Sequence, residues 1–96
     1  MVFTGLIKKE DNQYSSLCLE LDVASCGASE AEAVEGLKSA VDAYLEVIKE
    51  ENLQELLHRP VPIEGLRQFL FGGMNEEQFV KTISFRLDYA EESIEQ

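Results

Sequence analysis

The chain of 96 residues is poor in several residue types on which function often depends. It contains one histidine, two cysteines, two prolines and no tryptophan. The cysteines, Cys18 and Cys26, form no C-x-x-C pair and have no histidine nearby, so their spacing offers too few ligands for a zinc site. We therefore expect two small thiols, buried or half-buried, in a reducing compartment.

Long apolar segments and positive charge are also scarce. No stretch approaches the length needed to cross a bilayer, and the start, MVFTGLIKKED, lacks the basic and apolar regions of a signal peptide. The formal net charge of -11 opposes binding to nucleic-acid phosphates and to anionic membranes. We expect a cytoplasmic protein with no direct nucleic-acid or membrane contact. Its acidic surface either suits a basic partner or only keeps the protein soluble.

Catalytic motifs are missing as well. The sequence holds no glycine-rich phosphate loop and no nucleophile elbow. His58 is expected to be a structural residue at a helix C-terminus, because catalysis by a lone histidine needs an activated partner. Glu20 and Asp22 would share one face of a strand, but they lack a third ligand. We predict a protein that is not an enzyme, with no catalytic residue, no metal and no cofactor.

The residues that are present predict one α+β domain over 1–89, followed by an acidic tail over 90–96. Runs with alternating or β-branched side chains predict antiparallel strands. These runs are Val2–Lys9, Gln13–Leu21, Val23–Cys26 and Phe79–Tyr89. In the second run, Leu17, Leu19 and Leu21 are expected to share the buried face, because alternate residues of a strand point the same way.

The clearest local feature is a helix entry near Gly27. Gly27 is expected to free the backbone for a bend, and Ser29 with Glu32 forms a capping box. Apolar residues then recur at three- and four-residue steps, which predicts one long amphipathic helix to about Glu50, packed on one face of the sheet. They are Val34, Leu37, Val41, Tyr44, Leu45 and Ile48. The helical pattern from Leu53 to about His58 either continues this helix or forms a second one, and Pro60 and Pro62 end it.

A second apolar group lies between these prolines and the last strand. Ile63 to Phe71 is compatible with a short helical turn, and Gly72-Gly73 breaks it. The apolar residues here either plug the end of the core or dock another subunit or a partner. As the contact of a homo-oligomer or of a partner we predict Phe69, Phe71 and Met74.

The first half of the chain, over about residues 3–48, resembles the HicB antitoxin-like family. Its second predicted strand, YSSLCLELD, contains the Glu20-Leu21 pair that often ends this strand in the family. The segment Gly27-Ala28-Ser29-Glu30-Ala31-Glu32-Ala33 is similar to the family's Gly-x-[Thr/Ser]-x-x-Glu-Ala helix entry. The helix body VEGLKSAVDAYLE looks like the family's amphipathic run.

The resemblance implies a partial ribonuclease-H-like fold, an antiparallel sheet with a helix packed on it. It implies a protein that binds a small basic toxin and blocks its cleavage of messenger RNA by occlusion, and that assembles as a dimer or tetramer. Many family members also carry a DNA-binding domain, whereas residues 60–96 are predicted to form a loop and one long strand. The alternatives are a self-associating module without a toxin and, ranked last, an enzyme that uses Glu20 and Asp22.

Overall fold

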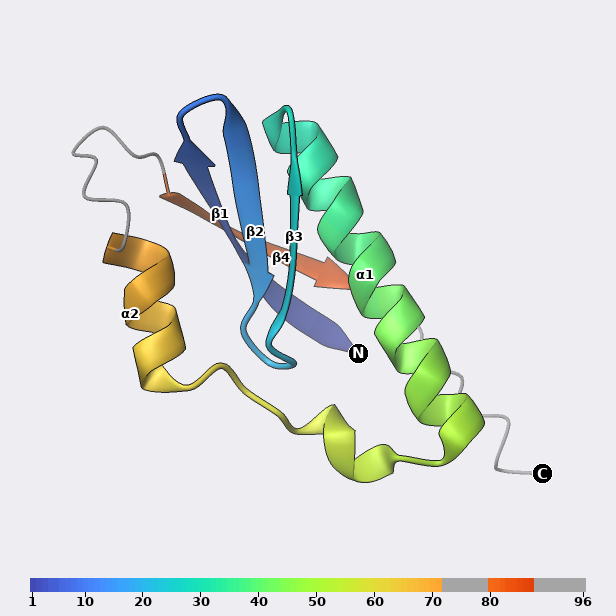
Figure 1. Ribbon diagram of the computed structural model, residues 1–96. Helices are drawn as coiled ribbons and strands as arrows, with labels where there is room; N and C mark the ends of the chain where they lie inside the picture. Colours follow the sequence, from blue (N-terminus) through green and yellow to red (C-terminus); the bar gives the residue numbers. More distant parts are fainter. Residues whose placement is uncertain (72–79, 88–96) are drawn as a thin grey trace.

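The computed structural model describes residues 1–71 and 80–87 of the chain. The elements in chain order are β1 (Val2–Glu10), β2 (Gln13–Cys18), β3 (Val23–Gly27), α1 (Glu30–Glu51), the 3-10 helix η1 (Gln54–Leu57), α2 (Ile63–Phe71) and β4 (Val80–Arg86). The strands form one antiparallel sheet in the order β3-β2-β1-β4, and α1 packs against it (Figure 1). The predicted α+β class and the long helix on the sheet are confirmed. The predicted tail, 90–96, lies outside the described residues, as do Phe79, Tyr89 and Met74.

Strand β2 ends at Cys18, three residues earlier than predicted. The chain turns over Leu19 to Asp22, where the Asp22 N–H donates to the Cys18 carbonyl oxygen at 3.0 Å. Asp22 takes a left-handed backbone with φ 57°, which aspartate tolerates better than most residues. The alternation of leucines thus continues past the strand into a turn that leads directly to β3.

The face of β2 that meets α1 is the opposite of the predicted one. Gly5 and Ile7 of β1 pair with Cys18 and Ser16, and both partners are fully buried. The Ser16 hydroxyl donates to the Ala33 carbonyl oxygen of α1 at 3.0 Å. Small side chains therefore face the helix on β2, because they let it approach closely.

Leu17 instead lies on the second face of the sheet, paired with Leu6 of β1. Both leucines are buried, at 6% and 8% exposure. Leu21 does reach the helix-side core, but from the turn rather than from a strand. Alternation alone could not indicate which face meets α1, because the middle of the sheet is buried on both sides.

The apolar stripe of α1 is buried as predicted at Leu37, Val41, Leu45 and Ile48, whereas Val34 and Tyr44 are only half-buried. Each fully buried aliphatic side chain contributes about 1.5–3 kcal/mol. The helix ends at Asn52, which has a left-handed φ of 60° and donates its N–H to the Ile48 carbonyl oxygen. The segment Leu53–His58 is therefore separate from α1 and contains η1.

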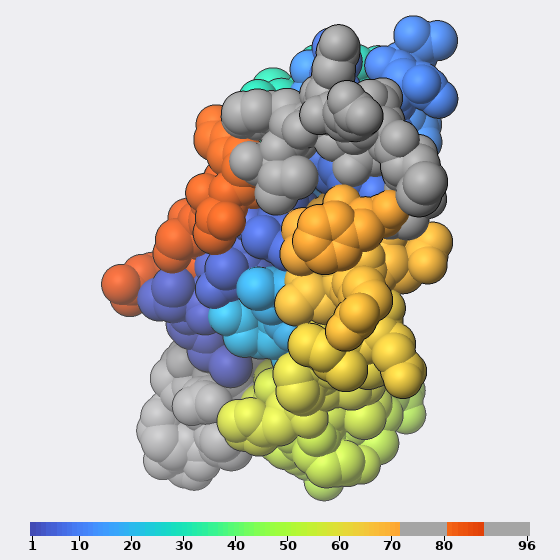
Figure 2. Space-filling model, turned by 90° about the vertical axis from the view of Figure 1, so that its left-hand side faces the viewer, coloured from blue at the N-terminus to red at the C-terminus, as the bar shows by residue number. Residues whose placement is uncertain are grey.

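Helix α2 is longer than the predicted turn and lies on the other side of the sheet from α1 (Figure 1). Figure 2 views this side, with α2 in yellow to orange in front of the sheet and β4 in orange-red beside it. The connection to α2 is tied to the turn after β2, because Val61 N–H donates to the Leu19 carbonyl oxygen at 3.0 Å and Arg59 donates to that of Leu21. In the part of the chain that the structure describes, no helix is long and apolar enough to cross a membrane.

Candidate functional site

The predicted helix entry is formed by Gly27, Ser29 and Glu32. Ser29 Oγ accepts from the Glu32 N–H at 3.1 Å, and Glu32 Oε1 accepts from the N–H of Ala28 at 2.9 Å. Gly27 does not make the expected bend: it is the last residue of β3, and no described glycine has positive φ. What it provides is space, since a Cβ there would lie 2.6 Å from Ala33 N. Together, these three residues cap the first turn of α1 and let it pack closely against β3.

The outer face of α1 carries more carboxylates than ammonium groups, with Lys38 and Lys49 lying among Glu35, Asp42, Glu46 and Glu50. It exposes Glu35, Asp42 and Glu46, and only Glu35 has an ion-pair partner among the described residues, Lys38 at 3.7 Å. Asp42 and Glu46 are one turn apart, so their like charges repel. Val47 beside them is 51% exposed. Since α1 has 22 residues, this face is about 33 Å long, and it suits a basic surface with some apolar contact.

The predicted contact residue Phe69 is used inside the molecule. It is half-buried, and its carbonyl oxygen accepts from the ammonium of Lys8, which is 2% exposed. The Lys8 Nζ also lies 5.0 Å from the Phe69 ring centroid. A positive charge near the C-terminal end of a helix interacts favourably with the helix dipole. Lys8 thus holds the last turn of α2 against the sheet, a role that the sequence analysis missed although a lysine stands out in the apolar run of β1.

Lys8 is balanced by Glu10, whose Oε2 lies 2.8 Å from the ammonium. The hydrogen bond from Lys8 holds the pKa of the Glu10 carboxyl below its ordinary value, against the opposing effect of burial. Of the other predicted contact residues, Phe71 is 68% exposed, and Met74 lies outside the described residues. The predicted contact residues therefore do not form one surface. Phe69 packs inside the molecule, whereas Phe71 faces outward.

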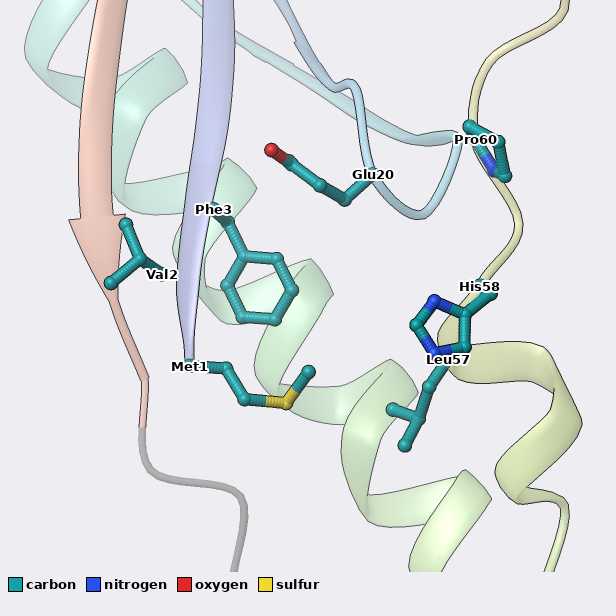
Figure 3. A pocket seen from close by; sticks show the side chains of 7 residues that line it. All are labelled: Met1, Val2, Phe3, Glu20, Leu57, His58 and Pro60. Atoms are coloured by element: carbon teal, nitrogen blue, oxygen red, sulfur yellow. The ribbon is translucent and has the colours of Figure 1, made fainter.

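A pocket of about 310 Å³ opens at one end of the sheet (Figure 3). It is lined by Met1, Val2, Phe3, Glu20, Leu57, His58 and Pro60. In Figure 3 the Glu20 side chain extends toward β1 and away from the His58 ring. Glu20 Oε1 accepts from the Thr4 N–H at 2.8 Å and from the Cys18 thiol at 3.7 Å. Because β2 ends at Cys18, this carboxylate takes the place of a strand partner for Thr4.

The hypothesis of a Glu20–Asp22 pair on one strand face is wrong in its geometry, because both residues lie in the turn after β2. Asp22 is exposed, and its carbonyl oxygen accepts from Arg59 Nη2 at 3.3 Å. Within residues 1–71 and 80–87, no group of three His, Cys, Asp or Glu side chains could hold a metal. Cys18 is buried and Cys26 exposed, and burial raises the pKa of the Cys18 thiol.

Comparison of the chain with protein-family models, curated proteins and solved structures gave no match. On the outer face of α1, Asp42 and Glu46 are exposed and have no ion-pair partner among the described residues.

Proposed function

We propose that the chain is a HicB-like, antitoxin-type binding protein of the cytoplasm, which neutralises a small basic, messenger-RNA-cleaving toxin by occlusion. The observation that carries the proposal is the acidic outer face of α1, with Asp42 and Glu46 exposed side by side. The order of three strands and then a helix on the sheet is the order that the family resemblance implies, and it supports a partial ribonuclease-H-like fold. Two free thiols fit a reducing compartment.

The physical reason is charge complementarity. A basic partner placed over Asp42 and Glu46 relieves their mutual repulsion, and opposite charge speeds the encounter of the two proteins. A standard interface buries about 800 Å² on each partner, which a helix face about 33 Å long can supply with its flanks. Val47 adds apolar contact within the patch. Occlusion needs no chemistry from this chain.

The test begins with the genes on either side of this one, and co-expresses the chain with any small basic protein that they encode. We expect a complex on affinity purification, rescue of growth, and binding that weakens as ionic strength rises. The double variant Asp42→Lys/Glu46→Lys should lose both the complex and the rescue.

The matched control is Glu55→Lys/Glu64→Lys, which makes the same change in net charge at exposed positions outside α1. It should retain binding. If the wild type forms no complex and gives no rescue, the proposed function is overturned. If both double variants weaken binding equally, binding depends on the net charge of the chain and not on the α1 face.

A second candidate is an orphan module that associates only with itself. It is favoured by the outward apolar side chains of α2, since Ile63 and Phe71 are each 68% exposed. A gene neighbourhood without a small basic reading frame, together with self-association of the purified chain, would support this candidate over the first.

A further inference from the structure

Strand β4 forms one edge of the sheet, and its register shows where its backbone groups point. Ser84 lies opposite Thr4 of β1. The Thr4 N–H donates to Glu20 Oε1 at 2.8 Å, and its carbonyl oxygen accepts from Leu19 N–H at 3.0 Å. Both groups of Thr4 point away from β4, so Ser84 and Thr4 do not hydrogen-bond each other. The N–H and C=O of Ser84 must therefore point away from β1, toward the outer edge of the sheet that the structure describes.

The same alternation continues along β4. Met1 and Leu87 exchange two hydrogen bonds, of 2.9 and 3.0 Å, so the odd-numbered residues bond to β1. The outward groups then belong to Thr82, Ser84 and Arg86. In the described ranges 1–71 and 80–87, no strand pairs with this edge. Three alternate residues in a row thus offer backbone donors and acceptors to a further strand.

Edge strands avoid such pairing with proline, bulges and charged side chains, and in β4 the charged residues, Lys81 and Arg86, lie only near its ends. The strand VKTISFR contains no proline, and its register with β1 runs unbroken from Val80 to Arg86, without a bulge. Lys81 is paired with Glu30 in the first turn of α1 at 2.5 Å. The stretch Thr82–Phe85 is uncharged.

We propose that β4 pairs antiparallel with β4 of a second copy of this chain, about a two-fold axis at Ser84, so that the two sheets become one. In this register Ile83 opposes the partner's Phe85 on the α1 side. On the second face, Thr82 opposes the partner's Arg86, and Ser84 opposes the partner's Ser84. No like charges meet, and about six backbone hydrogen bonds form.

A second copy fits this edge better than a foreign strand because the edge is self-complementary, as a two-fold interface requires. The side chain of Ile83 is half-buried in the single chain and would become more buried in the dimer. Helix α1 packs over β3, β2 and β1, so its acidic face stays open in the dimer. The dimer is thus independent of toxin binding.

Analytical ultracentrifugation of the full chain over a concentration series tests the proposal. The wild type should approach twice the monomer mass. Ser84→Pro removes an outward N–H that an edge strand can spare, and it should weaken association by about tenfold or more. Ser84→Thr keeps the N–H and should dimerise like the wild type. Circular dichroism melting of each variant reports whether the fold is intact.

Crosslinking tests the register without depending on the proline variant. In a Cys26→Ser background, Ser84→Cys places two thiols across the axis with Cα atoms about 5.5 Å apart, which a disulfide can span. Thr82→Cys is the matched control on the same strand face, because its two copies lie about 13 Å apart. Oxidation should give a covalent dimer only with Ser84→Cys.

A wild type that stays monomeric at every concentration would overturn the proposal, and so would equal crosslinking of the two cysteine variants. Dimerisation of a folded Ser84→Pro as tight as that of the wild type would do the same. A dimer that binds no basic protein would support this inference and count against the proposed function.

Discussion

The variant Gly27→Ala tests how closely α1 approaches the end of β3. A Cβ at this position would lie 2.6 Å from Ala33 N, 2.6 Å from Glu32 Cβ and 2.7 Å from the Glu32 carbonyl carbon. Ordinary contacts of a Cβ begin at about 3.4 Å. Two of these three atoms belong to the backbone, so no rotamer change relieves the overlap. The first turn of α1 must retreat by roughly 1 Å, and its packing contacts weaken.

The expected cost follows from opposing effects. Overpacking of this kind costs about 1–3 kcal/mol, and loss of the Ser29 cap would add about 1 kcal/mol. Replacing glycine also restricts the unfolded chain, which stabilises the protein by about 0.4–1 kcal/mol. We expect a net loss of about 1–3 kcal/mol. For a domain of this size that lowers Tm by about 5–20 °C.

Urea unfolding followed by circular dichroism measures this difference, with Gly65→Ala as the control. Gly65 lies in the first turn of α2, where, among the described residues, a Cβ would meet the side chains of Val61 at 3.3 Å and Pro62 at 3.8 Å and no backbone atom. Its replacement should stabilise the protein by up to about 1 kcal/mol. If Gly27→Ala is as stable as the wild type, or gains stability like Gly65→Ala, the argument from close approach is wrong.

Two further predictions concern carboxylates. Glu20→Ala leaves the Thr4 N–H without its acceptor and should cost about 1–2 kcal/mol in urea unfolding, whereas Glu20→Gln keeps an oxygen and should cost less; equal losses would contradict the capping role. Because the folded pKa of Glu10 is lowered, its stabilisation is present above the unfolded pKa and is lost as pH falls through the folded one. Solvent screening keeps this contribution small. Stability of the wild type should therefore fall more steeply in acid than that of Glu10→Gln, and parallel pH profiles would count against the ion pair.

Local sequence determined the elements of the first half of the chain. The spacing of Leu37, Val41, Leu45 and Ile48 predicts α1, and the Ser29–Glu32 cap marks its start, because both signals act within one or two helical turns. Polar breaks set the limits of β1 and β3 for the same reason. The acidic outer face of α1 follows directly from this periodicity. The sequence nevertheless predicts the partner contact elsewhere, at Phe69, Phe71 and Met74, because exposed apolar side chains are the more familiar signal of an interface.

Only the tertiary structure decided what each face meets. Ser16 and Cys18 rather than Leu17 face α1, because α2 lies on the second face of the sheet and both faces of its middle are buried. The contact of Lys8 with Phe69 joins residues 61 positions apart, and no local pattern predicts it. The outward backbone groups of Ser84 depend on the partners of Thr4 across the sheet. Local periodicity determines which way side chains alternate, whereas contacts between distant segments decide which side of the sheet is covered and which way the backbone groups of β4 point.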